Sequence, residues 1–358
     1  MDTAALWRLA VLRAFPVQHP LGQAMAAAGF VQADPIRAPA RAQDLILRHR
    51  VPGYRAGELE RRYPRLGLEE GTLYAYGFMP AEVRRWLLPR YDPEAPDGRF
   101  VAAGLAAEVL AFVRDRGPTH PAALAERFSD ARQVNAWGGM SKATTRTLDR
   151  LLHHGLVRVA RRDAGIRVYQ ATPEPQAEFA PAVRLECLVL LVASALAPVA
   201  AATLVSAMAR MTRAVIGPQA RHDAVAALLR AGTLEATVVD GVRYLWPAAA
   251  DAGGRVHGGV RFLAPFDPLV WDRRRFEQLW GWPYRFEAYT PPARRRLGYY
   301  AMPLLWGTDV IGWVNCTQVA GRLDVQAGFV GRKPGADFRR AFDAEVAHME
   351  AFLALTQD

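Results

Sequence analysis

The sequence predicts an α+β protein in which one arrangement of helices and hairpins occurs more than once. Two regions each contain an amphipathic helix that ends at a glycine, Gly155 in one and Gly232 in the other. Each helix is followed by two short strands around a tight turn, at residues 163–165 and 240–241, where Asp and Gly are typical of hairpins. The two glycines lie 77 residues apart, which indicates an internal repeat.

Two further helices precede the glycine-terminated helix in each copy. We expect them at residues 102–115 and 121–128 in the first copy, and at 182–195 and 199–210 in the second. The last helix of the first copy is expected to begin near Ser141. Three helices followed by a hairpin are the layout of a winged helix-turn-helix domain. The sequence therefore predicts two such domains in tandem.

The N-terminal part of the chain has a less regular pattern. We expect helices at 4–14, 21–28 and 41–50, a strand at 73–79 and a short helix at 81–88. These elements are compatible with a third, more divergent winged helix, which would make three in tandem.

Segments rich in proline and glycine at 91–98, 172–175 and 253–259 are candidate linkers. The predicted domains are an N-terminal winged-helix-like domain at 1–98, a second winged helix at 99–175, a third at 176–252 and a β-rich C-terminal region at 253–358. In that last region, strands are expected at 285–289, 299–305, 310–317 and 323–329, and an amphipathic helix at 338–355. The region thus reads as an antiparallel sheet closed by a helix.

The composition describes a globular protein with a basic balance. The chain carries 45 Lys and Arg residues against 35 Asp and Glu, a net charge of +10. A basic balance suggests an anionic partner such as nucleic acid. Only Lys142 and Lys333 are lysines, and together with the high content of Ala, Gly and Pro this arginine bias is also what a GC-rich genome produces.

The cysteines and the apolar segments bear on the compartment. Two cysteines far apart, Cys187 and Cys316, give neither a disulfide framework nor a zinc site. The first residues lack the features of a signal peptide. Residues 187–209 carry no charge, but Pro198 interrupts them and their halves fit the repeat, so we do not expect a membrane span. The expected location is the cytoplasm, in association with the nucleoid.

Basic side chains cluster in the central winged helix. Its third helix is expected to display Lys142, Arg146 and Arg150 on one face, and its hairpin adds Arg161, Arg162 and Arg167. Such a helix can enter a DNA groove while the hairpin touches phosphates. The alternative is that the hairpin arginines are only a solvated surface.

A second basic cluster lies in the C-terminal region. Arg273 and Arg274 belong to it, and Arg295 follows in a second run of arginines just before two tyrosines, Tyr299 and Tyr300. Arginine binds phosphate in bidentate fashion, and aromatic rings stack on bases. The alternative is an internal network between these arginines and Asp267 or Glu287.

The strongest catalytic candidates are Gln32 and Asp34. Side chains two residues apart in an extended segment point to the same side, and Pro35 favours an extended Asp34. A carboxylate beside an amide can polarise a water molecule or face a developing positive charge. The alternative is a strand end at which Asp34 caps a turn before Pro35.

Taken together, several stretches resemble the winged-helix crosslink-repair DNA glycosylases, the AlkZ/YcaQ-like family. The likeness covers nearly the whole chain and is carried by residues 29–36, 40–44, 50–54, 160–169, 264–273, 289–291 and 298–300. The resemblance implies three tandem winged helices around a concave DNA-binding surface, excision of N7-alkylated purines and unhooking of interstrand crosslinks. The family's catalytic motif, Gln, any residue, then Gln or Asp, matches Gln32 and Asp34.

The resemblance also implies a mechanism. A purine alkylated at N7 is already cationic, so we expect Asp34 to stabilise the oxocarbenium-like sugar and to act as general base, with Gln32 orienting the water. We expect a monofunctional, monomeric enzyme on double-stranded DNA that contains alkylated purines, with no metal or organic cofactor.

One departure keeps other functions open. Many members carry a Glu and a His in the region that matches residues 73–80, and this chain has neither there. A scaffold that senses lesions without catalysis therefore remains an alternative. So does a winged-helix transcription regulator, because the fold alone does not determine activity.

Overall fold

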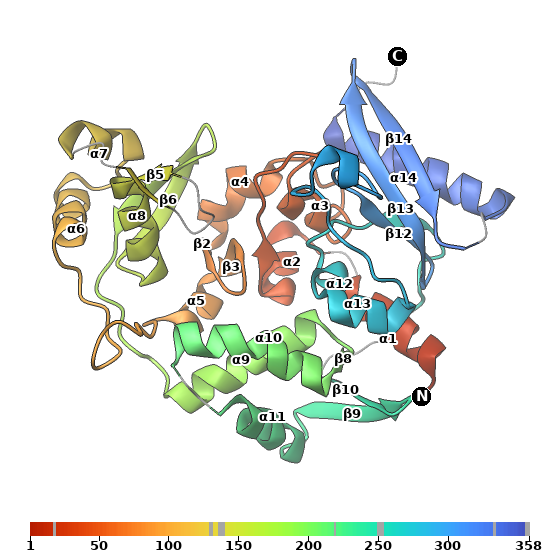
Figure 1. Cartoon of the computed structure of the whole chain (residues 1–358), viewed down its shortest axis with the longest axis horizontal. Coiled ribbons are helices and arrows are strands. Elements are labelled where there is room, and N and C mark those ends of the chain that lie inside the picture. The colour runs from red at the N-terminus through yellow and green to blue at the C-terminus, as the bar shows by residue number, and fades with distance from the viewer. Residues whose placement is uncertain are drawn as a thin grey trace. The chain divides into compact units, whose positions relative to one another are not determined.

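The computed structural model describes residues 1–16, 19–128, 132–134, 140–217, 220–248, 254–331 and 334–354 (Figure 1). The chain forms two compact units. Unit 1 comprises Met1–Leu59, Leu188–Met208 and His222–Asp358, and unit 2 comprises Glu60–Cys187 and Ala209–Arg221. Unit 2 contains the whole of the predicted 99–175 domain, and unit 1 the whole of the predicted 253–358 region. The four predicted domain boundaries stay a prediction.

Unit 1 begins with short helices. These elements are α1 (Thr3–Ala14), α2 (Leu21–Ala28), β1 (Val31–Gln32), α3 (Ala42–Leu47) and α4 (Glu58–Arg62), the last of which runs into unit 2. The Asp2 side chain caps α1 by accepting a hydrogen bond from Ala5 N at 2.8 Å. The helices predicted at 4–14 and 21–28 are confirmed, whereas the one predicted at 41–50 ends at Leu47.

Unit 2 starts with a hairpin of which the sequence indicated only one strand. Its first elements are η1 (Tyr63–Leu66), β2 (Leu68–Thr72), β3 (Tyr76–Pro80) and α5 (Ala81–Leu87). Strands β2 and β3 pair antiparallel from Leu68↔Pro80 to Thr72↔Tyr76. The strand predicted at 73–79 is therefore β3, shifted by a few residues, and β2 was missed.

The next part of unit 2 has the predicted order of three helices and a hairpin. Its elements are α6 (Leu105–Arg116), α7 (Pro121–Arg127), β4 (Arg132–Val134), β5 (Met140–Lys142), α8 (Ala143–His153), β6 (Val157–Asp163) and β7 (Ile166–Ala171). Leu110, Leu124, Leu151, Val157 and Tyr169 belong to its buried core. Helix α8 begins two residues later than predicted, because the backbone of Lys142 ends strand β5. Lys142 therefore does not share a helix face with Arg146 and Arg150.

The second copy repeats this order with a comparable strand pairing. It consists of α9 (Pro181–Ala195), β8 (Val199–Ala200), α10 (Ala201–Val215), α11 (Arg221–Arg230), β9 (Leu234–Val239) and β10 (Val242–Pro247). In this copy β8, between the first two helices, pairs with β10, the second hairpin strand. In the first copy Thr119 occupies the same place in the order and pairs with Tyr169 of β7. This shared pairing supports the predicted internal repeat.

The C-terminal part of unit 1 is a sheet covered by a helix. It contains β11 (Val260–Phe262), α12 (Pro268–Trp271), α13 (Arg273–Trp280), η2 (Pro292–Arg294), β12 (Met302–Trp306), β13 (Asp309–Val319), β14 (Arg322–Phe329) and α14 (Ala336–Leu353). The strands form an antiparallel sheet in the order β11-β12-β13-β14. Figure 1 shows α14 across one face of this sheet, where Phe338 meets Trp306 and Phe329 at 5.6 Å between ring centroids.

One strand prediction in this region is wrong. Residues 285–289 form no strand, because Phe286 packs its ring edge-on against Phe266 at 5.0 Å and Tyr300 at 5.3 Å. The alternation of polar and apolar residues at 285–289 thus reflects packing in an aromatic cluster rather than pairing in a sheet. The mixed fold class with an antiparallel C-terminal sheet and a closing helix is confirmed.

The apolar stretch at 187–209 is divided between two helices. Helix α9 ends at Ala195, and α10 begins at Ala201. Within the part of the chain that the structure describes, we find no helix with the length and apolar character that crossing a bilayer requires.

Candidate active site

The catalytic candidates follow a sharp end of helix α2. Gly29 takes the left-handed conformation, with φ +64°, and terminates the helix through a hydrogen bond to Met25 O. A Cβ atom at this position would lie 2.3 Å from Leu191 Cδ1. Glycine is thus required here both by the backbone and by packing, and it directs the chain into β1 and on to Asp34.

Gln32 is the better buried of the two candidates. Its side chain lies in β1, and the residue is 9% exposed. The amide oxygen Oε1 is buried and has no hydrogen-bond partner among the described residues. An unpaired buried oxygen is costly in a folded protein and is a candidate water-binding group.

Asp34 lies just beyond the strand and forms a turn. Its Oδ1 accepts a hydrogen bond from Ile36 N at 2.9 Å, while its own backbone N donates to Gln43 Oε1 at 3.4 Å. The alternative interpretation, that Asp34 caps a turn at Pro35, therefore describes part of its role. In the described part of the chain, Oδ2 makes no hydrogen bond and the carboxylate makes no ion pair.

The Asp34 carboxyl group is half-buried. Burial raises its pKa, and the hydrogen bond from Ile36 acts in the opposite direction. No arginine contributes to this shift. A carboxylate that is partly desolvated and lacks a cationic partner has the character of a general base rather than of a structural ion pair.

Tyr289 and Tyr300 lie within electrostatic range of Asp34, and Tyr299 lies within electrostatic range of both. We call Tyr289, Tyr299 and Tyr300 the tyrosine cluster. Burial, and after it the negative charge of Asp34, raises the pKa of both Tyr289 and Tyr300. Tyr289 is 79% exposed, whereas Tyr300 is 3% exposed and its hydroxyl has no partner among the described residues. The guanidinium of Arg295 lies 5.0 Å from the centre of the Tyr299 ring.

The sequence did not place this cluster beside Asp34. Tyr299 and Tyr300 follow a run of arginines, and all three tyrosines belong to family-like stretches, but neither feature indicates that they lie near Asp34. The available signal was three tyrosines within twelve residues, 289 to 300, in a region that carries part of the family likeness.

Buried polar contacts hold the segment that follows Asp34. Arg50 binds Asp267 through two hydrogen bonds, of 2.8 and 3.0 Å, and Asp267 is completely buried. Asp44 Oδ1 accepts hydrogen bonds from Tyr54 OH at 2.8 Å and from Gly57 N at 3.0 Å. The family-like stretches 40–44, 50–54 and 264–273 are thus joined to one another inside unit 1.

The predicted basic residues of unit 1 differ in how they are used. Arg273 donates to the carbonyls of Val270 at 2.6 Å and Pro265 at 2.9 Å. Arg274 is exposed. Arg295 is half-buried and donates from Nε to Thr290 O at 2.8 Å. The alternative of an internal network is not supported for these side chains, because Asp267 binds Arg50, and Glu287 accepts from the backbone N atoms of residues 296–298.

The predicted basic residues of unit 2 also divide into two groups. Arg146 and Arg150 of α8 and Arg161 of β6 are exposed, Arg150 binding Glu94 at 3.0 Å and Arg161 binding Asp163 at 2.9 Å. Arg162 and Arg167 are engaged inside the unit. The side chain of Lys142 lies outside the described residues.

Among the predicted basic residues of unit 2, Arg162 makes the most extensive contacts inside the protein. Its Nε donates to Glu70 Oε1 at 2.9 Å, and its guanidinium also contacts Oε2 of the same carboxylate. Glu70 accepts a further hydrogen bond from Tyr76 OH. Arg167 lies 5.2 Å from the Tyr76 ring centre and binds Asp149 at 3.0 Å. Arg162 thus neutralises a buried carboxylate and is not a solvated hairpin residue.

Two histidines and a glutamate form a group with the spacing of a metal site. The ligand atoms of His49, Glu345 and His348 lie within 4.8 Å of one another. Arg48 forms an ion pair with Glu345, and its guanidinium lies 3.4 Å from His348 Nδ1. Burial lowers the pKa of His49, which keeps it neutral. The arginine occupies the place of a cation, so the group fits an ion-pair network better than a metal.

Comparison with protein families places the chain among the DNA glycosylases. The chain belongs to the AlkZ-like DNA glycosylase family, because the family model for "DNA glycosylase AlkZ-like" matches residues 25–352. It is similar to the solved structure of the Streptomyces sahachiroi DNA glycosylase AlkZ, with a TM-score of 0.63 and 15% sequence identity. That similarity covers 100% of this chain and 98% of the other, so the two share their fold over the whole length. The predicted resemblance is confirmed.

Proposed function

We propose that this protein is a monofunctional DNA glycosylase that hydrolyses the N-glycosidic bond of N7-alkylated purines, including those in interstrand crosslinks. The observation that carries the proposal is the state of Asp34, a half-buried carboxylate beside the tyrosine cluster with no ion pair among the described residues. A carboxylate in that state can act on a water molecule and on a developing positive charge.

The mechanism uses the two residues in different roles. Alkylation at N7 makes the purine a cationic leaving group, so no added acid is needed. As the bond breaks, the sugar becomes oxocarbenium-like, and the negative charge of Asp34 stabilises it. Asp34 then accepts a proton from the attacking water, which Gln32 orients through its unpaired Oε1. The hydrogen bond from Ile36 N fixes the carboxylate and leaves Oδ2 for the water.

The proposed DNA-binding surface comes from three tandem winged helices, of which the two repeated element orders support the second and third. The exposed residues Arg146, Arg150, Arg161 and Arg274, with Arg295 on Tyr299, are the proposed contacts with double-stranded DNA. Arg162, Arg167 and Arg273 are engaged inside the protein and are proposed to support the surface rather than touch DNA. Lys142 remains a proposed contact.

The direct test uses duplex DNA that contains one N7-methylguanine. The purified protein is expected to release free N7-methylguanine and to leave an abasic strand that is cut only after alkali, as a monofunctional enzyme does. It is expected to act as a monomer, which light scattering measures. A duplex with an N7-linked crosslink, assayed for strand separation, tests the second substrate class.

The decisive variant is Asp34→Ala. It is expected to lower the excision rate by about 10² to 10⁴ and to leave the affinity for the same duplex nearly unchanged. Asp309→Ala, which removes an exposed carboxylate at the start of β13, is the matched control and should behave like the unmodified protein. Equal loss of binding and excision in Asp34→Ala would assign Asp34 to the turn alone. Binding without release of base by the unmodified protein would favour a non-catalytic winged-helix regulator or lesion sensor.

A further inference from the structure

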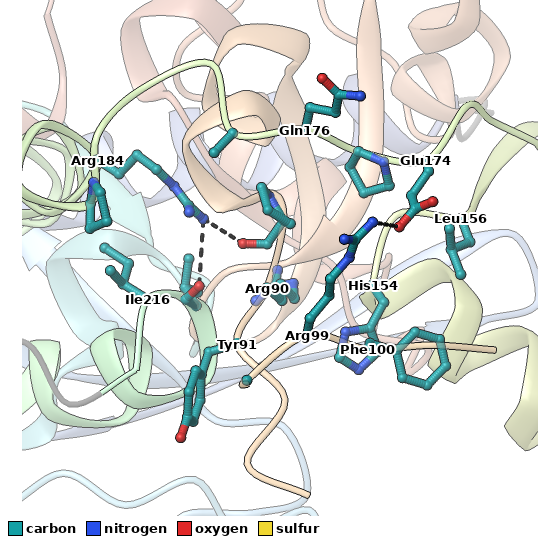
Figure 2. A pocket seen from close by; sticks show the side chains of 16 residues that line it. Arg90, Tyr91, Arg99, Phe100, His154, Leu156, Glu174, Gln176, Arg184 and Ile216 are labelled. Atoms are coloured by element: carbon teal, nitrogen blue, oxygen red, sulfur yellow. Dashed lines mark hydrogen bonds and ion pairs between the residues drawn. The ribbon is translucent and has the colours of Figure 1, made fainter. Parts of the chain in front are cut away.

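A pocket of about 470 Å³ lies entirely within unit 2, away from the residues proposed for catalysis. Its walls come from the segment after α5, from Phe100, from the residue after α8 and from the start of α9 (Figure 2). Three arginines and a histidine are among the residues that line it: Arg90, Arg99, His154 and Arg184. The volume lies within the range usual for small-ligand sites.

Arg90 is a buried cation without an acidic partner. It is 3% exposed, its guanidinium donates to Thr72 O, and its Nε has no partner among the described residues. Burial, together with the positive charges of Arg84 and Arg184, lowers the pKa of Arg90 to about 9. No carboxylate contributes to that shift. An uncompensated buried charge is costly, and a group in this state that lines a cavity is a candidate ligand-binding group.

Arg184 adds a second such cation. Its Nε donates to Trp86 O at 2.8 Å and its guanidinium to Pro89 O at 2.7 Å, as Figure 2 shows in part. The acceptors of these hydrogen bonds are backbone carbonyls, which orient the guanidinium but do not neutralise it. Burial lowers the pKa of Arg184 as well.

The acidic groups near the pocket already have arginine partners. Glu174 forms an ion pair with Arg99 at the exposed rim (Figure 2). Asp92 lies 3.5 Å from Arg150. Burial, opposed by Asp92, lowers the pKa of His154 to about 4, so this residue is neutral, and it stacks on Phe100 at 4.0 Å. The positive charges of Arg90 and Arg184 are therefore not neutralised by the acidic residues near the pocket.

We propose that this pocket binds the phosphate group of a phosphorylated ligand, through the guanidinium groups of Arg90 and Arg184. Arginine is suited to this because its planar fork binds phosphate oxygens in pairs, and burial strengthens each charge-assisted hydrogen bond. Arg99 contributes a third cation at the rim, held back by Glu174. His154 and Tyr91 also line an adjacent cavity of about 520 Å³, which offers room for the group attached to the phosphate.

The first experiment titrates inorganic phosphate into the full-length protein by isothermal calorimetry, with sodium chloride at equal ionic strength as the reference. Saturable binding is expected. The rim ion pair gives variants with opposite signs that do not disturb the core: Arg99→Gln should weaken binding about threefold, and Glu174→Gln should strengthen it about threefold. Arg339→Gln, an exposed arginine of α14, is the matched control and should change nothing.

The second experiment examines the buried cation. Arg90→Gln should weaken phosphate binding by at least about tenfold, since a charge-assisted hydrogen bond is lost. Circular dichroism checks that the variant is folded, and if it is not, the two rim variants decide. The proposal is overturned if phosphate gives no saturable signal above chloride, or if both rim variants bind phosphate like the unmodified protein.

Two competitors identify the source of the phosphate. A nucleoside 5′-monophosphate that binds more tightly than inorganic phosphate indicates a small phosphorylated ligand, and a short undamaged duplex that displaces phosphate indicates a DNA strand. Either result supports the site, because in both cases the guanidinium of Arg90 binds a phosphate group. Asp34→Ala should bind phosphate normally. Failure of the proposed glycosylase activity would therefore not argue against the phosphate site, and failure of phosphate binding would not argue against the glycosylase activity.

Discussion

The carboxylate of Asp34 must be charged to act as a base, and its burial works against that charge. Burial raises the pKa of Asp34, and the hydrogen bond from Ile36 only partly compensates. The turn thus fixes the position of Asp34, and partial desolvation makes its carboxylate more basic. Gln32 is fixed in a comparable way, because β1 holds its backbone while Oε1 stays unpaired among the described residues.

A pH dependence follows from the raised pKa. Protonation of Asp34 removes both the base and the negative charge, so excision should fall as the pH is lowered through the pKa of Asp34. Because that pKa is raised, the fall should begin at a higher pH than for an ordinary aspartate. Single-turnover release of N7-methylguanine, corrected for release without enzyme, measures it. In Asp34→Asn the residual activity should show no such acid limb, and an identical limb in both proteins would assign the titration to another group.

The exposed ring of Tyr289 gives a second prediction at this scale. Tyr289 is 79% exposed beside Asp34, so we expect it to stack on a base of the bound DNA. Tyr289→Ala should weaken binding to the lesion duplex by about 1–3 kcal/mol, measured by fluorescence anisotropy, without changing the unfolding midpoint. Tyr289→Phe keeps the ring and should bind normally. Loss of affinity in the Phe variant would point to the hydroxyl instead.

Among the elements, the end of α2 decides how the catalytic segment is presented. Gly29 and Gly53 both have positive φ values, of +64° and +61°. An added Cβ would lie 2.3 Å from Leu191 Cδ1 at the first position, and it would meet nothing within 4 Å at the second. Both alanine variants carry the backbone strain, but only one also disturbs the packing of α2 against Leu191.

This difference can be measured by urea unfolding. Gly53→Ala should cost about 1–2 kcal/mol from the left-handed backbone alone. Gly29→Ala should cost about 2–4 kcal/mol, because displacing Leu191 adds to the same strain. Equal losses in the two variants would show that Leu191 rotates away freely and that the contact with α2 contributes little.

Local signals explain which elements were predictable. Glycine caps, hairpin turns and helical periodicity lie within a few residues of each other, so most helices and the two repeated hairpins could be predicted from them. Strand β2 could not, because Glu69, Glu70 and Gly71 are residue types depleted in strands. Its buried Glu70 depends on Arg162, 92 residues further along the chain.

In the whole molecule, the predictable part of the candidate site was Gln32 and Asp34, whose spacing is local. The tyrosine cluster was not predictable, because Asp34 and Tyr289 are 255 residues apart and only folding brings them together. The basic residues were predictable as a class but not singly. Net charge does not distinguish Arg162, which neutralises a buried carboxylate, from Arg161 on the surface of the same strand.

Two adjacent arginines test how the net charge of +10 is used for binding DNA. Arg274 is exposed, whereas Arg273 donates to the carbonyls of Val270 and Pro265. If Arg274 contacts a phosphate, Arg274→Gln should reduce the slope of log K against log salt concentration by about 0.9, the contribution of one phosphate on duplex DNA. Its stability should not change. The slopes come from binding isotherms on an undamaged duplex at several salt concentrations.

Arg273→Gln is the matched comparison. It removes the same charge from the next position, but its guanidinium is committed to backbone carbonyls. We therefore expect a lower unfolding midpoint and an unchanged salt slope, measured at a temperature at which the variant is folded. A reduced slope in both variants would show that Arg273 leaves its carbonyls to reach DNA. An unchanged slope in both would exclude this stretch from the DNA-binding surface and leave Arg295 as the remaining proposed contact of unit 1.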